Sequence, residues 1–172
     1  IDWATTPKAL SSLASSATDQ SGAFAALQGT LSLPRSAVVV GRFQETDDDG
    51  ARRPGLTVSV PKRSLVTSPV AGTLRYAGPL LDLGEVAILE PEQGTLLVYA
   101  GLGHALGSAG DILRPGAPLG FMPGEDTRAD QILIETRDGT GHVGREKLYI
   151  EIRQGEDHSD PSSWFDLPEA ED

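Results

Sequence analysis

Four side chains with binding chemistry recur at every second position near the end of the chain: Lys147, Tyr149, Glu151 and Arg153. Because side chains alternate between the two faces of a β-strand, all four are expected on one face. Tyrosine offers an apolar ring and one hydroxyl, and arginine offers a forked donor for a carboxylate. This row of side chains therefore indicates either a partner-binding face or an ordinary solvated face.

The three histidines, His104, His142 and His158, could in principle supply zinc ligands or a general base. Each lies in a different polar, Gly-rich or acidic stretch, and none pairs with a carboxylate or second histidine at metal-ligand spacing. We therefore expect surface histidines and no metal site. Residues 47–50 (DDDG) lack the ligand spacing of an EF-hand, so we expect a solvated acidic loop. No Gly-x-Ser-x-Gly nucleophile turn is present in the sequence.

The composition restricts the class of partner. The 172 residues carry 14 basic and 25 acidic side chains, a net charge of −11, which argues against unaided binding to nucleic acid or anionic lipid. Hydrophobic residues make up 38% of the chain, enough to predict a folded domain. The absence of cysteine excludes disulfide and thiol chemistry. No apolar run approaches the roughly 20 residues of a membrane span, and no signal peptide is visible.

A helix is predicted at residues 7–28, because Pro7 suits a first helical turn and apolar residues recur at three- and four-residue steps. Gly29 is expected to end it. The helix either packs on its own domain or is the end of a longer helical region. Since residue 1 is Ile, we expect the chain to be a mature or trimmed fragment.

Short β-branched runs separated by Gly, Pro and Asp turns follow from residue 31 on. This pattern predicts a mostly β, antiparallel domain, with charged loops at 46–53 and 121–129 and a hairpin turn at Asp138-Gly139. We therefore divide the chain into a helical segment (1–28), a β domain (29–167) and an acidic tail (168–172). Strands are expected at 37–40, 56–60, 72–77, 86–90, 95–100, 131–136 and 147–153.

Five segments resemble, in order and spacing, the motifs of the LytM (lysostaphin-type) zinc peptidase domain. They are residues 68–78 (SPVAGTLRYAG), 86–100, 110–120 (GDILRPGAPLG), 148–155 (LYIEIRQG) and 160–165 (DPSSWF). The resemblance as a whole extends over roughly residues 29–166. The resemblance implies an antiparallel LytM-type β-sheet domain behind the N-terminal helix.

The resemblance also implies where zinc ligands would stand in an active peptidase, and this chain departs from the pattern at each place. Arg53 and Thr57 occupy the positions of the first His and Asp, and Tyr149 occupies that of the last His. Gly101 and Lys147 replace two further histidines of the family. Arginine and lysine have no lone pair to offer a metal at neutral pH. The sequence therefore predicts a non-enzyme without cofactor, although a divergent zinc endopeptidase stays as an alternative.

The form of the last strand, with Tyr in place of the second His, is similar to that of the murein hydrolase activator EnvC family. That resemblance implies a periplasmic, non-catalytic activator of N-acetylmuramoyl-L-alanine amidases, which act on peptidoglycan at cell division. It also implies an N-terminal coiled coil, outside this chain, that docks on the FtsE–FtsX complex. A passive peptidoglycan-binding domain is the other alternative.

The implied binding site is the emptied peptidase groove. Tyr149 and Arg153 are expected to face it, together with Lys147 and Glu151. We also expect that residues 7–28, or the chain before them, could block the groove. Tyr99, Tyr76 and Gly101 are further groove candidates, although either tyrosine could instead fill the sheet's edge, and Trp164 is expected to cap the core.

Overall fold

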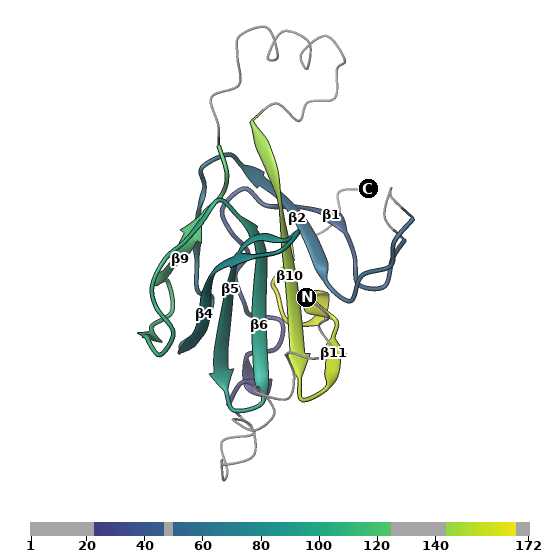
Figure 1. Cartoon of the computed structure of the whole chain (residues 1–172). Helices are drawn as coiled ribbons and strands as arrows, with labels where there is room; N and C mark the ends of the chain where they lie inside the picture. The colour runs from purple at the N-terminus through teal and green to yellow at the C-terminus, as the bar shows by residue number, and fades with distance from the viewer. Residues whose placement is uncertain (1–22, 47–49, 125–143, 168–172) are drawn as a thin grey trace, which may run out of the picture.

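Two antiparallel sheets make up the part of the chain that the computed structural model describes, residues 23–46, 50–124 and 144–167 (Figure 1). The larger sheet has the strand order β1-β2-β10-β6-β5-β4-β8, with β11 paired to β10, and the smaller has the order β3-β9-β7. The strands are β1 (Val38–Gly41), β2 (Leu56–Pro61), β3 (Leu65–Thr67), β4 (Gly72–Leu80), β5 (Gly84–Glu92), β6 (Thr95–Leu102), β7 (His104–Ala105), β8 (Ile112–Leu113), β9 (Pro118–Phe121), β10 (Arg145–Gln154) and β11 (Asp157–Ser159).

The main hydrophobic core lies on one face of the larger sheet. In β10 the buried residues alternate with half-exposed ones, as the period of two requires: Leu148, Ile150 and Ile152 are fully buried. A second, smaller cluster of Val86, Ile88, Val98 and Ala100 lies apart from the main core. The residues next to these four in the sequence of β5 and β6 belong to the main core. The second cluster therefore lies on the opposite face of the larger sheet.

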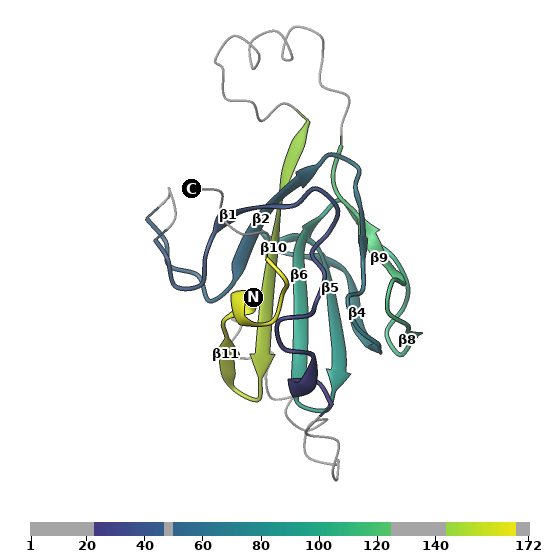
Figure 2. The same cartoon turned by 180° about the vertical axis from the view of Figure 1, so that it is seen from behind.

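The two ends of the described chain close the main core together. Two short 3-10 helices, η1 (Ala25–Leu27) and η2 (Pro161–Ser163), lie over the same face of the sheet (Figure 2). The rings of Phe24 and Trp164 stack at 4.4 Å between centroids, and the Trp164 indole N–H donates to Ser159 Oγ at 2.8 Å. Trp164 is only 3% exposed, so its predicted place over the core is confirmed.

The mostly β, antiparallel class predicted from the sequence is confirmed. Each strand expected between residues 37 and 100, and the one at 147–153, corresponds to β1, β2, β4, β5, β6 or β10. The short strands β3, β7, β8, β9 and β11 were not predicted, and the expected loop at 121–129 begins one residue too early, because Phe121 ends β9. The strand expected at 131–136 and the turn at Asp138-Gly139 lie outside the described residues.

The predicted N-terminal helix is described only from residue 23 on, and there the chain forms the three-residue η1 rather than an α-helix. Gly29, which follows, has φ of 83°, a conformation that favours glycine and ends a helical turn, as expected. The rest of the predicted helix lies outside the described residues. No helix within the described ranges is long and apolar enough to cross a membrane.

Candidate binding groove

A groove of about 890 Å³ opens at one end of the larger sheet, where β10 begins and β6 ends. Its lining includes Arg53, Thr57, Gly101, Lys147 and Tyr149. These five residues come from three separate parts of the sequence. The structure therefore brings together every residue that stands at a former ligand or histidine position in the sequence comparison with the LytM motifs.

The register of three neighbouring strands explains why these residues meet. Tyr149 of β10 lies directly opposite Thr57 of β2 on one side and Ala100 of β6 on the other. Gly101 follows Ala100, and a Cβ atom at Gly101 would lie 2.9 Å from the backbone oxygen of Lys147. The groove floor is thus continuous backbone from β2 through β10 to β6.

Tyr149 forms the centre of this floor. Its ring lies against Gly55, where an added Cβ would come within 2.6 Å of the ring atoms Cε2 and Cζ. Its hydroxyl donates a hydrogen bond to Glu151 Oε1 at 2.8 Å. Burial, followed by the negative charge of Glu151, raises the pKa of the Tyr149 phenol, and nearby Arg53 opposes this shift. The phenol is therefore neutral at physiological pH and presents a half-buried ring to the groove.

Replacing Gly55 with alanine should lower the free energy of unfolding by about 1–3 kcal/mol, the usual cost of overpacking a filled site. The new Cβ would meet both the Tyr149 ring and the Ile150 backbone oxygen at 2.6 Å, and the backbone atom cannot move aside cheaply. Urea unfolding followed by circular dichroism measures the change. Gly94→Ala is the background control for a glycine with no atom within 4 Å of the new Cβ, although its φ of 85° adds strain of its own.

A loss of stability well below about 1 kcal/mol for Gly55→Ala would mean that the Tyr149 ring is not fixed against Gly55. In that case the groove floor would be rearranged in solution.

Glu151 and Arg153 share the strand face of Tyr149, as predicted, but they lie beyond the lining of the groove. Strand β11 places His158 opposite Arg153, and the His158 Nε2 atom lies 3.7 Å from Glu151 Oε2. His158 therefore has a carboxylate neighbour in space that the sequence spacing did not indicate. The hydrogen bond from Tyr149 and the contact with His158 together connect the groove floor to the β10–β11 edge.

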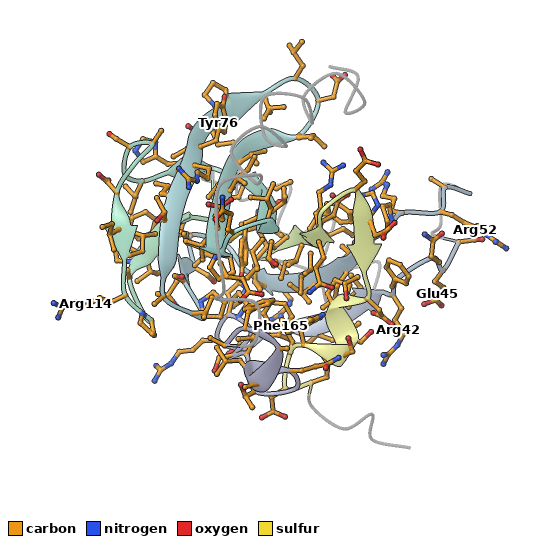
Figure 3. All side chains as sticks on the ribbon, turned by 90° about the horizontal axis from the view of Figure 1, so that it is seen from below. Arg42, Glu45, Arg52, Tyr76, Arg114 and Phe165 are labelled. Atoms are coloured by element: carbon orange, nitrogen blue, oxygen red, sulfur yellow. The ribbon has the colours of Figure 1, made fainter. Side chains whose placement is uncertain are left out.

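Tyr99 was a wrong groove candidate. It is 1% exposed and packs in the main core, on the opposite face of β6 from Ala100. Its hydroxyl has no hydrogen-bond partner among the described residues, and burial raises its pKa. Tyr76, whose side chain is labelled in Figure 3, is half-buried against the second cluster, and its hydroxyl donates to the Pro79 backbone oxygen. It therefore packs beside the groove rather than lining it.

The side chains in the groove do not fit a zinc ion. Arg53 and Lys147 are cations without a lone pair, and Gly101 contributes no side chain. In the described ranges, no group of three or more histidine, cysteine, aspartate or glutamate residues is placed to hold a metal. His104 lies 3.5 Å from Glu85 and is largely exposed, as expected for a surface histidine, and His142 lies outside the described residues. The groove's chemistry is that of a binding surface with cations, two carboxylates (Asp82 and Glu146), hydrogen-bonding groups and one aromatic ring.

Solved structures identify the fold. The chain superposes on lysostaphin with a TM-score of 0.58 at 13% identity, covering 83% of this chain and 57% of that one. It matches a chain of the pore-forming complex of SpoIIQ and SpoIIIAH with a TM-score of 0.58 at 19% identity, covering 81% and 93% of the two chains. The domain has the LytM, or lysostaphin-type, peptidase fold. Such low identities establish the shared fold alone.

Sequence comparison gives one further relative. The chain is 27% identical over 142 residues to the protein named "Uncharacterized protein NMB1333" from Neisseria meningitidis. The match covers 83% of this chain but 21% of that protein, so the chain spans about a fifth of its relative's length. No protein-family model matches the sequence.

Proposed function

We propose that this chain is a non-catalytic LytM-type domain that activates a periplasmic N-acetylmuramoyl-L-alanine amidase by binding a segment of it in the groove. The observation that carries the proposal is the groove itself. It gathers Arg53, Thr57 and Tyr149, the residues at the positions where the sequence resemblance expects zinc ligands. A concave site with an aromatic ring and exposed cations is suited to a protein or peptide partner.

Two further facts support a binding role. SpoIIQ, which has the same fold, is part of a complex with another protein, SpoIIIAH. The resemblance of residues 148–155 to the EnvC form of the last strand points to amidases as the class of partner, and to the FtsE–FtsX complex as the partner of a preceding region. The domain would act in the periplasm during peptidoglycan cleavage at cell division.

Activation requires a difference in affinity between two states of the amidase. The groove stabilises the open state only if it binds the segment covering the amidase's active centre better than the amidase does. A coupling free energy of about 1–3 kcal/mol corresponds to about 5–150-fold activation. The proposal therefore expects an effect of this size on amidase activity and no hydrolysis by the domain itself.

Dye release from labelled peptidoglycan tests this proposal. The samples are the domain alone, the amidase of the same organism alone, and the two together. We expect no release by the domain alone and at least about 5-fold more release by the mixture than by the amidase. Chelator-sensitive release by the domain alone would identify a zinc endopeptidase instead. Retention of the domain on sacculi without any change in amidase activity would identify a passive peptidoglycan-binding module.

A further inference from the structure

A second depression, of about 610 Å³, lies beside the turn that joins β4 to β5. We call it the β4–β5 depression. Its lining consists of four apolar residues, two glycines and two carboxylates: Pro79, Leu80, Leu81, Asp82, Gly84, Glu85, Leu102 and Gly103. Of these eight, Asp82, Gly84 and Leu102 also line the binding groove. The other five give the β4–β5 depression walls of its own, and no lysine or arginine is among the eight.

The backbone around the β4–β5 depression is held by hydrogen bonds. The Leu83 N–H donates to the Leu80 backbone oxygen at 3.0 Å, and the Gly101 N–H donates to the Leu83 backbone oxygen at 2.9 Å. On β4, the Tyr76 hydroxyl donates to the Pro79 backbone oxygen. A ligand would therefore meet a largely preformed surface, which is the usual condition of a binding site.

The apolar part of this surface is open to solvent at Leu81, which is 72% exposed. A single exposed leucine is common on protein surfaces and by itself indicates nothing. Leu81, however, adjoins Leu80 and Leu102 in the wall of one depression. Together they offer an apolar surface along which an aliphatic chain can lie.

The acidic part of the lining is oriented at Glu85. The Ala105 N–H donates to Glu85 Oε2 at 3.2 Å, and His104 Nδ1 lies 3.5 Å from the same oxygen. Within the described part of the chain, Glu85 Oε1 accepts no hydrogen bond. One carboxylate oxygen is thus fixed by the protein, and the other is left to accept from a ligand.

These walls select a particular kind of side chain. Carboxylates accept hydrogen bonds and attract positive charge, so the ligand needs a cationic donor. The apolar walls require an aliphatic portion next to that donor. Lysine and arginine have both, because their stems lie along apolar surface while the charged end reaches a polar partner. The net charge of −11 adds attraction at longer range.

We infer that the β4–β5 depression binds a basic side chain, lysine or arginine, of a partner protein. Its aliphatic stem lies on Leu80 and Leu81, and its charged end reaches the Glu85 carboxylate. The cations Arg145 and Lys147 line the neighbouring groove and not the β4–β5 depression. The inference is independent of the proposed function, since it needs neither an amidase nor the floor formed by β2, β10 and β6.

The test titrates the ¹⁵N-labelled 172-residue chain with three small probes and follows the backbone amide signals by NMR. N-acetyl-lysine methylamide carries stem and charge, N-acetyl-norleucine methylamide carries the stem alone, and methylammonium chloride carries the charge alone. We expect the lysine probe to give saturable shifts at residues 80–85 and 102–103, with a dissociation constant on the order of 1 mM. The other two probes should bind at least about 5-fold more weakly. Added salt should weaken binding of the lysine probe and leave that of the norleucine probe unchanged.

Two variants and two matched controls locate the binding. Leu81→Ser and Glu85→Gln should each weaken the lysine probe at least about 5-fold, and glutamine can still accept from the Ala105 N–H. Ile112→Ser and Glu156→Gln make the same chemical changes elsewhere, since Ile112 is 84% exposed on β8 and Glu156 is exposed between β10 and β11. Both controls should bind within about twofold of wild type. Thermal unfolding checks that all four variants are folded.

Four results would overturn the inference. Equal binding of methylammonium would leave only a diffuse acidic surface, and equal binding of the norleucine probe would remove the recognition of charge. The absence of any saturable shift would mean that no such site exists. Self-association in sedimentation that Leu81→Ser abolishes would show that a second copy of this chain covers the β4–β5 depression. None of these results involves amidase activation, so each leaves the proposed function standing.

Discussion

Replacing Tyr149 with alanine should weaken binding to the amidase by about 30–1000-fold. This corresponds to a loss of about 2–4 kcal/mol of binding free energy, which is typical of a central aromatic contact. The ring forms the groove floor, lies against Gly55 and is half-buried before any partner arrives. Little side-chain entropy is therefore lost on binding, which is the property that makes a tyrosine a strong anchor. Titration of the domain into the dye-release assay gives the concentration needed for half-maximal activation.

Tyr149→Phe is the matched control, because it keeps the ring and removes only the hydroxyl that donates to Glu151. We expect it to bind within about 10-fold of wild type, because the ring is kept and the lost hydrogen bond lies inside the domain, where it contributes to folding stability. Urea unfolding accompanies both variants, because removing the ring also leaves a cavity above Gly55. A folded Tyr149→Ala domain that activates like wild type would place the partner surface outside this groove.

The site could be predicted from the sequence only where polar and apolar residues alternate clearly along a strand. Within β10, the aliphatic residues Leu148, Ile150 and Ile152 alternate with charged residues and Tyr149, so the face carrying Lys147 and Tyr149 followed from the sequence. Residues 95–100 (TLLVYA) contain no such alternation, because both faces of β6 are covered by hydrophobic clusters. The face of Tyr99 was therefore undetermined, and an aromatic residue in a core strand was mistaken for a groove residue.

The exposure of Leu81, which is 72% exposed, could not be foreseen for a different reason. Leu80, Leu81 and Leu83 read as the continuation of a hydrophobic strand, and only the turn at Asp82 separates the exposed leucine from its neighbours. The contact between His158 and Glu151 is equally invisible in sequence, because it depends on the register between β10 and β11. Strands of two to four residues, such as β7 to β9, are too short for a period of two to be recognised.

At Gly101 the backbone conformation itself disfavours a side chain. Its φ of 95° favours glycine, and any Cβ at this position would crowd the Lys147 backbone oxygen at 2.9 Å. A histidine here would require both the turn and the adjacent strand to move. Arg53, Thr57 and Tyr149 already carry a Cβ atom. The three positions that the resemblance assigns to ligands can therefore be substituted without changing Gly101.

The triple variant Arg53→His, Thr57→Asp and Tyr149→His should accordingly bind about one zinc ion per chain, with a dissociation constant of about 1 µM or lower, about 8 kcal/mol of binding free energy. All three positions line one groove, and Thr57 and Tyr149 are direct neighbours across β2 and β10. Two histidines and one carboxylate form a common protein ligand set for zinc. Elemental analysis of the dialysed protein and calorimetric titration with zinc measure the gain.

Arg53→His alone is the control and should bind no more zinc than wild type, because a single imidazole cannot hold the metal at micromolar affinity. Circular dichroism and thermal unfolding verify that the triple variant keeps its sheet. A folded triple variant without zinc would mean that residues 53, 57 and 149 are not the former ligand positions. Stoichiometric zinc in the wild type would contradict the non-catalytic role itself. Zinc in the triple variant alone would show that the ligand side chains, rather than the strand framework of β2 and β10, separate this groove from a metal centre.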